Sequence, residues 1–82
     1  MTVEERILDI IARGGHIDRA KLTPDATLET LGIASIDIVE ILMLLEEELN
    51  VYISVDETLS NISNVQELVD ALAKKVNEKA TN

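Results

Sequence analysis

Apolar side chains recur at helical spacing from the start of the chain. Thr2 stands three residues before Glu5, which is the spacing of a capping box, and this pair predicts that a helix begins after Thr2. Gly14 and Gly15 are expected to end that helix. Its buried stripe is formed by four apolar residues: Val3, Ile7, Ile10 and Ile11.

The next segment, residues 16–34, loses helical periodicity. It contains the only proline of the chain, Pro24, in a turn-like stretch after Thr23. We therefore expect a long first loop here. Four apolar side chains are expected to hold this loop against the core: Leu22, Leu28, Leu31 and Ile33.

A second amphipathic helix is predicted from about Ser35 to Asn50. At 100° per residue, one side of this helix is assigned to the core: Ile38, Val39, Leu42, Leu45 and Leu49. Another stripe mixes apolar side chains with carboxylates: Ile36, Glu40, Met43 and Glu47. Such a stripe suits a cationic, partly hydrophobic partner, although a solvated face with Ile36 and Met43 at the edge of the core explains it as well.

The last helix is expected from about Asn64 to Lys75, because Asn64 and Glu67 have capping-box spacing. Its apolar face is formed by Val65, Leu68, Val69, Leu72 and Val76. A single helical turn is expected near Glu57 to Asn61, and residues 77–82 are expected to be a frayed tail. The prediction is a single all-α domain, residues 1–82, with three longer helices and one short one around a long first loop.

Composition narrows the classes of function. Of the 82 residues, 46% are hydrophobic, but there is one Tyr and no Phe or Trp, so the core must be aliphatic. The formal charge of −9 argues against binding nucleic acid or an anionic membrane, since both need cationic patches. Basic partners are the natural complement, although the charge also fits a role in solubility alone.

Several kinds of site are excluded by residues that the chain lacks. It has no cysteine, so any thiol chemistry needs a thiol supplied from outside, and His16 is its only histidine, which predicts neither a metal site nor a serine triad. There is no signal-peptide pattern and no apolar run of transmembrane length. These observations predict a cytoplasmic protein without a membrane span. We also expect the protein to be a monomer.

The strongest candidate site is the stretch Leu31-Gly32-Ile33-Ala34-Ser35-Ile36-Asp37. It places the Ser35 hydroxyl where a helix begins, and the free N–H groups and the macrodipole of a first turn favour an anion such as a phosphate. A plain capping role is the alternative, since serine is a preferred N-cap residue.

From Thr27 to Ile53 the chain resembles the acyl carrier protein family, whose signature is Leu-Gly, two residues, Ser, an apolar residue and Asp before an acidic helix. The resemblance implies an acyl-carrier-like bundle, which is a carrier and not an enzyme. It also implies that Ser35 receives 4′-phosphopantetheine from coenzyme A and carries acyl groups as thioesters. The expected partners are a phosphopantetheinyl transferase and acyl-loading and acyl-processing enzymes with basic docking patches. The matching recognition positions are Ile36, Asp37, Glu40, Met43 and Glu47.

Two residues depart from the family's signature. The family usually has Asp before the modified serine, where this chain has Ala34, and Leu after it, where this chain has Ile36. A specialised carrier with dedicated enzymes fits this departure, in fatty acid, lipid or polyketide-type biosynthesis. The alternatives are an aminoacyl or peptidyl carrier of the same fold and an unmodified acidic helical adaptor. A small hydrolase lacks both a base and an oxyanion site.

Overall fold

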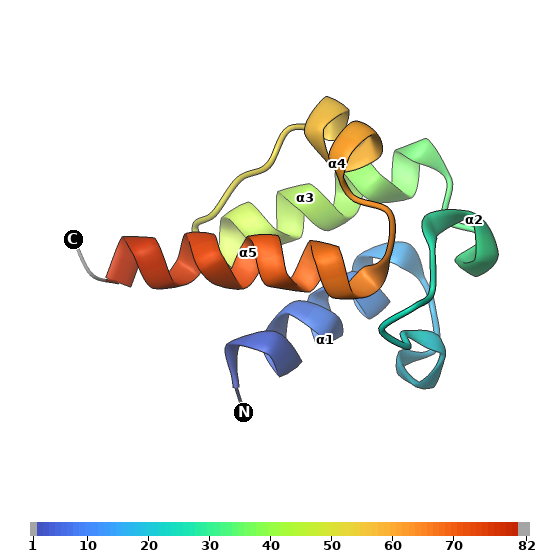
Figure 1. Ribbon diagram of the computed structural model, residues 1–82, viewed down its shortest axis with the longest axis horizontal. Helices are drawn as coiled ribbons and strands as arrows, with labels where there is room; N and C mark the ends of the chain where they lie inside the picture. Colours follow the sequence, from blue (N-terminus) through green and yellow to red (C-terminus); the bar gives the residue numbers. More distant parts are fainter. Residues whose placement is uncertain (1, 81–82) are drawn as a thin grey trace.

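The computed structural model describes residues 2–80, and its elements are helical, which confirms the predicted all-α class. The elements in order are α1 (Val3–Gly15), the 3₁₀ turn η1 (Arg19–Lys21), α2 (Leu28–Leu31), α3 (Ser35–Leu49), α4 (Val55–Asn61) and α5 (Val65–Ala80). The long helices α1, α3 and α5 form the bundle, and α4 packs on α3 (Figure 1). Within the described residues, no helix has the length and apolarity that crossing a membrane requires.

The core is aliphatic, as the composition predicted. Ile7, Ile10 and Ile11 of α1 are almost completely buried, and Thr58 is the one polar side chain among the buried residues of the described part. The predicted loop contacts are also confirmed, because Leu22 is buried and three further side chains pack partly buried on the core: Leu28, Leu31 and Ile33. The long first connection is therefore attached to the bundle along its length.

Helix α1 ends at Gly15, the second residue of the glycine pair, as predicted. Both glycines are nevertheless helical and buried, and the left-handed C-cap is the next residue, His16 (φ 56°). A Cβ on Gly14 would lie 2.8 Å from Cγ1 and 2.9 Å from Cα of Ile41 on α3. Gly14 is therefore needed for the close approach of two helices, a requirement that periodicity within α1 does not reveal.

The first connection is also more regular than expected, since it contains η1 and α2. Its carbonyl groups complete the start of a distant helix: the Val65 N–H donates to the Ala26 carbonyl at 2.8 Å and the Gln66 N–H to the Pro24 carbonyl at 3.0 Å. The Glu67 N–H donates to the Asn64 side chain at 2.9 Å, as the predicted cap requires. The free amides of the first turn of α5 thus find acceptors in two separate segments.

Helix α3 follows its predicted bounds, but one core assignment was wrong. Val39 is 43% exposed, whereas Ile41, which the prediction left out, is only 3% exposed. The reason is the direction of the buried arc: Ile41 lies within 60° of Ile38 on the helical wheel, and Val39 lies 100° away on the other side. Val39 consequently belongs to the outer face of the helix.

The two C-terminal helices differ from their predicted bounds. Helix α4 begins at Val55, two residues earlier than expected, because the Ser54 hydroxyl accepts from the Glu57 N–H at 3.1 Å and caps it. Helix α5 continues past Lys75 to Ala80, so residues 77–80 are helical and not a frayed tail. Residues 81 and 82, the rest of the predicted tail, lie outside the described residues.

An ion-pair network joins α1 to α3 at the surface. Arg13 Nη2 lies 2.8 Å from Glu48 Oε1, and Arg13 Nε lies 3.1 Å from Asp9 Oδ2. The hydrogen bond from Arg13 lowers the pKa of Glu48, and the same bond raises the pKa of Arg13. Both side chains are substantially exposed, so this network adds little to stability compared with the apolar contact beneath it.

Candidate functional site

The candidate site begins where the chain turns from α2 into α3. Gly32 ends α2 with φ +69°, a left-handed conformation that a residue with a Cβ adopts only at a cost. Ala34 then has extended geometry (φ −86°, ψ 162°) and is the N-cap of α3, and Ser35 is the first residue of the helix. The glycine of the Leu-Gly pair therefore permits the turn that brings Ser35 to the helix start.

The Ser35 side chain is exposed and takes no part in capping. The cap is made by Asp37, whose Oδ2 accepts a hydrogen bond from the Ala34 N–H at 3.2 Å. Among the described residues, no hydrogen bond occupies the Ser35 hydroxyl. The interpretation of Ser35 as an N-cap is therefore wrong, and its hydroxyl is accessible to a reagent from solution.

The backbone around Ser35 favours a negative group. The first intrahelical bonds of α3 come from the N–H groups of Asp37 and Ile38 to the Ala34 carbonyl, at 3.0 and 3.2 Å. The N–H groups of Ser35 and Ile36 precede them, where a helix offers no carbonyl acceptor. Together with the macrodipole of this 15-residue helix, they provide a positive potential beside the Ser35 hydroxyl.

The outer side of α3 carries a mixed apolar and acidic surface, which we call the outer face of α3 and define by five residues: Ile36, Val39, Glu40, Met43 and Glu47. Its apolar members are well exposed, with Ile36 at 77% and Met43 at 58%, so neither belongs to the edge of the core. All five line a shallow hollow on this helix. Sequence reasoning missed Val39, although its spacing of three and four residues from Ile36 and Met43 was a signal for the same face.

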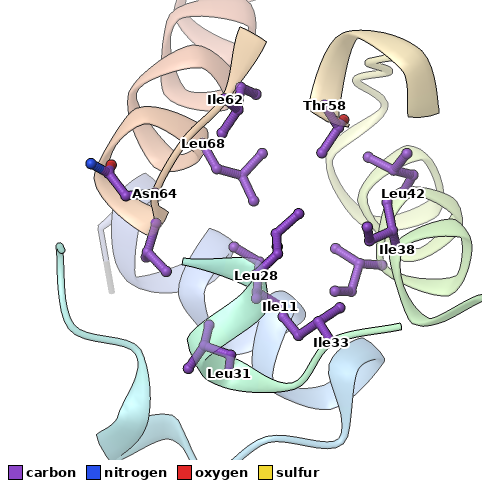
Figure 2. A pocket seen from close by; sticks show the side chains of 12 residues that line it. Ile11, Leu28, Leu31, Ile33, Ile38, Leu42, Thr58, Ile62, Asn64 and Leu68 are labelled. Carbon is purple, nitrogen blue, oxygen red and sulfur yellow. The ribbon is translucent and has the colours of Figure 1, made fainter. Parts of the chain in front are cut away.

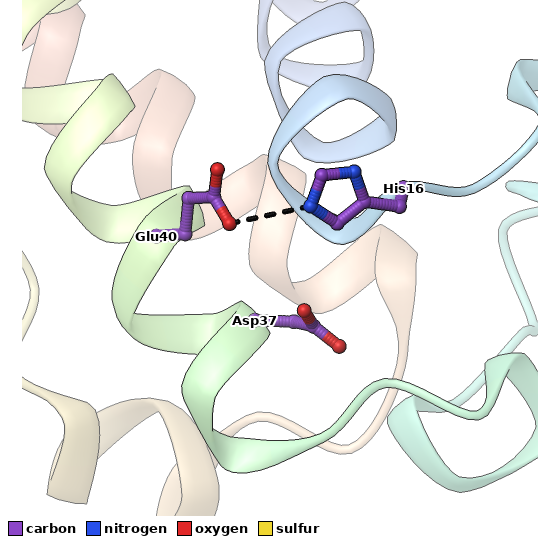
Figure 3. Close-up of side chains that lie close together, drawn as sticks. All are labelled: His16, Asp37 and Glu40. Carbon is purple, nitrogen blue, oxygen red and sulfur yellow. Dashed lines mark ion pairs between the residues drawn. The ribbon is translucent and has the colours of Figure 1, made fainter.

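Asp37 lies apart from this stripe. Its side chain is only partly exposed and is occupied in capping α3, and it points towards the end of α1, where His16 lies (Figure 3). It therefore differs in environment from Glu47, with which the sequence pattern had grouped it.

Charge is strongly segregated along the chain. All seven basic residues lie outside residues 22–73, whereas most of the sixteen acidic residues lie within that segment. Helix α3 and its flanking loops thus have no cationic side chain of their own. The one Lys or Arg side chain seen to pair with a carboxylate of α3 among the described residues is Arg13 of α1, which contacts Glu48 near the far end of the helix from Ser35.

An apolar cavity of about 20 Å³ lies behind the site, between α3, α2 and the start of α5 (Figure 2). Ile33 and Ile38, which flank Ser35 in the sequence, line it together with Leu28, Leu42, Ile62 and Leu68. This volume holds little more than one water-sized sphere. Leu28, Ile33 and Ile62 are only partly buried, so the walls that they form are the ones able to move outward.

Comparisons with known proteins agree with this geometry. The family described as "Phosphopantetheine attachment site" matches residues 5–72 of the chain. The acyl carrier protein of Solidesulfovibrio magneticus is 38% identical over 79 residues, which cover 95% of this chain and all of that protein. The acyl carrier protein of Buchnera aphidicola subsp. Acyrthosiphon pisum is 42% identical over 74 residues, which cover 89% of this chain and 91% of that protein.

Proposed function

The chain belongs to the acyl carrier protein family, whose members carry acyl groups on covalently attached 4′-phosphopantetheine and are not enzymes, and we propose that Ser35 is its attachment residue. The observation that carries this proposal is the exposed hydroxyl at the first position of α3, left free because the N-cap is Ala34 and not Ser35. The adjacent amides supply donors for the phosphodiester.

Attachment requires a nucleophile from this chain and little else from it. Ser35 Oγ forms the new P–O bond by attacking the pyrophosphate of coenzyme A, its proton passes to a base of the transferase, and adenosine 3′,5′-bisphosphate leaves. The attached arm supplies the thiol that this cysteine-free chain lacks. Tethering then keeps the acyl thioester at a high effective concentration near a docked enzyme, on the order of millimolar.

The intact mass of the purified chain tests this function directly. After incubation with coenzyme A and a phosphopantetheinyl transferase, we expect the mass to increase by one phosphopantetheine, because the proposal assigns attachment to a single residue, Ser35. An unchanged mass with every transferase tried, including the one from the same organism, would refute the proposal.

The expectation of a cytoplasmic location stays a prediction.

The cavity supports an aliphatic cargo. Its lining is apolar apart from Thr58 and Asn64, and the Thr58 hydroxyl already donates to the Ser54 carbonyl at 3.0 Å. An aminoacyl group would leave its ammonium without a charged acceptor there, whereas methylene groups lose only contact with water. We therefore favour an acyl chain, whose first carbons enter the cavity as α2 and the segment around Ile62 move outward.

We expect an octanoyl group on the arm to raise the melting temperature of the chain above that of the form with a free thiol. Each sheltered methylene contributes about 0.8 kcal/mol. In Ile62→Phe the larger ring fills the mouth of the cavity, so the gain on acylation should be lost while the unacylated form stays folded. Differential scanning calorimetry of both forms of both proteins measures this difference. An equal gain in wild type and variant would place the acyl chain outside the cavity.

We propose that the outer face of α3 recognises the basic patches of the transferase and of acyl-processing enzymes. In Glu47→Lys we expect the association rate with a transferase to fall by about threefold to tenfold at low salt, with helix content unchanged, because electrostatic steering acts mainly on the on-rate. Asp70→Lys on α5 is the matched control, since it changes the net charge by the same amount on another helix. Stopped-flow kinetics at several salt concentrations compare the two. Equal rates for both variants would show that only overall charge matters.

A further inference from the structure

A cluster of three potential metal ligands lies where the end of α1 meets the start of α3 (Figure 3). His16 is the C-cap of α1, and Asp37 and Glu40 lie on the first two turns of α3. His16 Nε2 is 3.4 Å from Glu40 Oε2, and one ligand atom from each of the three residues lies within 4.8 Å of the others. The fold thus supplies a histidine with neighbours that the sequence had not suggested.

The donor set is one imidazole nitrogen and two carboxylate oxygens, drawn from two elements of the fold. Ligands of tetrahedral Zn²⁺ at bond lengths of 2.0–2.1 Å are separated by about 3.3 Å, close to the observed nitrogen–oxygen distance of 3.4 Å. Asp37 Oδ2 is already held by the Ala34 N–H, which orients the carboxylate and leaves Oδ1 for an ion. Three protein ligands leave a fourth position for water.

The nitrogen donor decides which ion fits. A purely carboxylate surface suits hard cations such as Mg²⁺ and Ca²⁺, which prefer oxygen, whereas imidazole favours borderline first-row dications. Among the described residues, neither Asp37 nor Glu40 forms an ion pair with a Lys or Arg side chain that would compete with a metal ion. We propose that His16, Asp37 and Glu40 form a binding site for one Zn²⁺-like transition-metal ion.

Such an ion would regulate the carrier. If the proposed function holds, the ion neutralises Asp37 and Glu40, two carboxylates on the first two turns of α3, and so weakens the steering of a basic transferase. Zn²⁺ should therefore slow modification of the wild-type chain by a larger factor than it slows modification of His16→Asn. For each protein, the modification rate with Zn²⁺ is divided by the rate without Zn²⁺. Comparing these two ratios removes any direct effect of the ion on the transferase, because that effect is the same for both proteins.

Calorimetric titration of ZnCl₂ into the full unmodified chain tests the site itself. We expect saturable binding of one ion, weakened by about tenfold or more in His16→Asn and in Asp37→Asn, because each variant removes a ligand. Asparagine tolerates the left-handed backbone at position 16, so the first variant keeps the fold. Glu46→Gln, which removes a carboxylate of α3 outside the cluster, should bind Zn²⁺ as wild type does, and MgCl₂ should bind far more weakly than ZnCl₂.

Three results would overturn the site: no saturation with ZnCl₂, equal affinity of wild type and His16→Asn, or Mg²⁺ binding as tightly as Zn²⁺. Ser35→Ala should bind Zn²⁺ normally, since Ser35 contributes no ligand. Loss of phosphopantetheine attachment and loss of metal binding are thereby distinguished. Circular dichroism of each variant confirms that a change in binding does not follow from unfolding.

Discussion

Ser35→Ala is expected to abolish phosphopantetheine attachment completely while the fold remains intact. No other hydroxyl of the described residues stands at the first position of a long helix beside free amides, so nothing replaces the nucleophile. Because Ser35 is not the N-cap, we expect the free energy of unfolding to change by no more than about 0.5 kcal/mol, less than the loss of a capping hydroxyl. Intact mass and thermal melting measure the two effects.

Two further variants make this result specific. Ser60→Ala removes an exposed hydroxyl on α4 and should leave attachment unchanged. Ala34→Asp restores the residue usual in the family, and as an N-cap it should also stabilise α3 by about 1 kcal/mol. We expect it to increase modification by a general-purpose transferase. If phosphopantetheine were attached to Ser35→Ala, even slowly, another residue would have to carry the arm.

Gly14→Ala is expected to be the most destabilising of the conservative substitutions in α1. The new methyl group would lie 2.9 Å from the Ile41 Cα, and a backbone atom cannot rotate away as a side chain can. Overpacking costs about 1–3 kcal/mol, and the contact with a backbone atom places this substitution at the upper end, about 3 kcal/mol. After the helical gain of about 1 kcal/mol from replacing glycine, we expect a net loss of about 2 kcal/mol. For a domain of this size the melting temperature should fall by about 10 °C.

Gly15→Ala is the matched control at the neighbouring position. The three atoms nearest to its Cβ would be side-chain atoms of Ile17 and Ile41, with Ile17 Cδ1 nearest at 3.0 Å, and these side chains can change rotamer. We expect its stability to stay within about 1 kcal/mol of wild type, because the helical gain offsets the local crowding. If Gly14→Ala were instead as stable as Gly15→Ala, the close contact of α1 with α3 would not limit the fold.

Much of the site is local and therefore readable in the sequence. Gly32 ends one helix, Ser35 begins the next, and Asp37 lies in the first turn of that helix. Each position depends on backbone conformation within a few residues. The capping pairs behave in the same way, since Thr2 and Glu5 form the predicted capping box with both bonds at 3.1 Å. What local pattern did not reveal was which residue caps α3, because Ala34 has no side-chain acceptor and Asp37 reaches back instead.

The sequence by itself determined the helices, the aliphatic core, the acidic character of α3 and the serine at its start, because periodicity, capping and charge act over one or two turns. Tertiary structure alone decided the direction of the buried arc of α3, which exposes Val39 and buries Ile41. It also decided that Gly14 contacts Ile41 of α3 and that His16 lies close to Asp37 and Glu40. These features depend on how α1 packs against α3, and a helical period constrains a helix's own faces but not the neighbour that covers them.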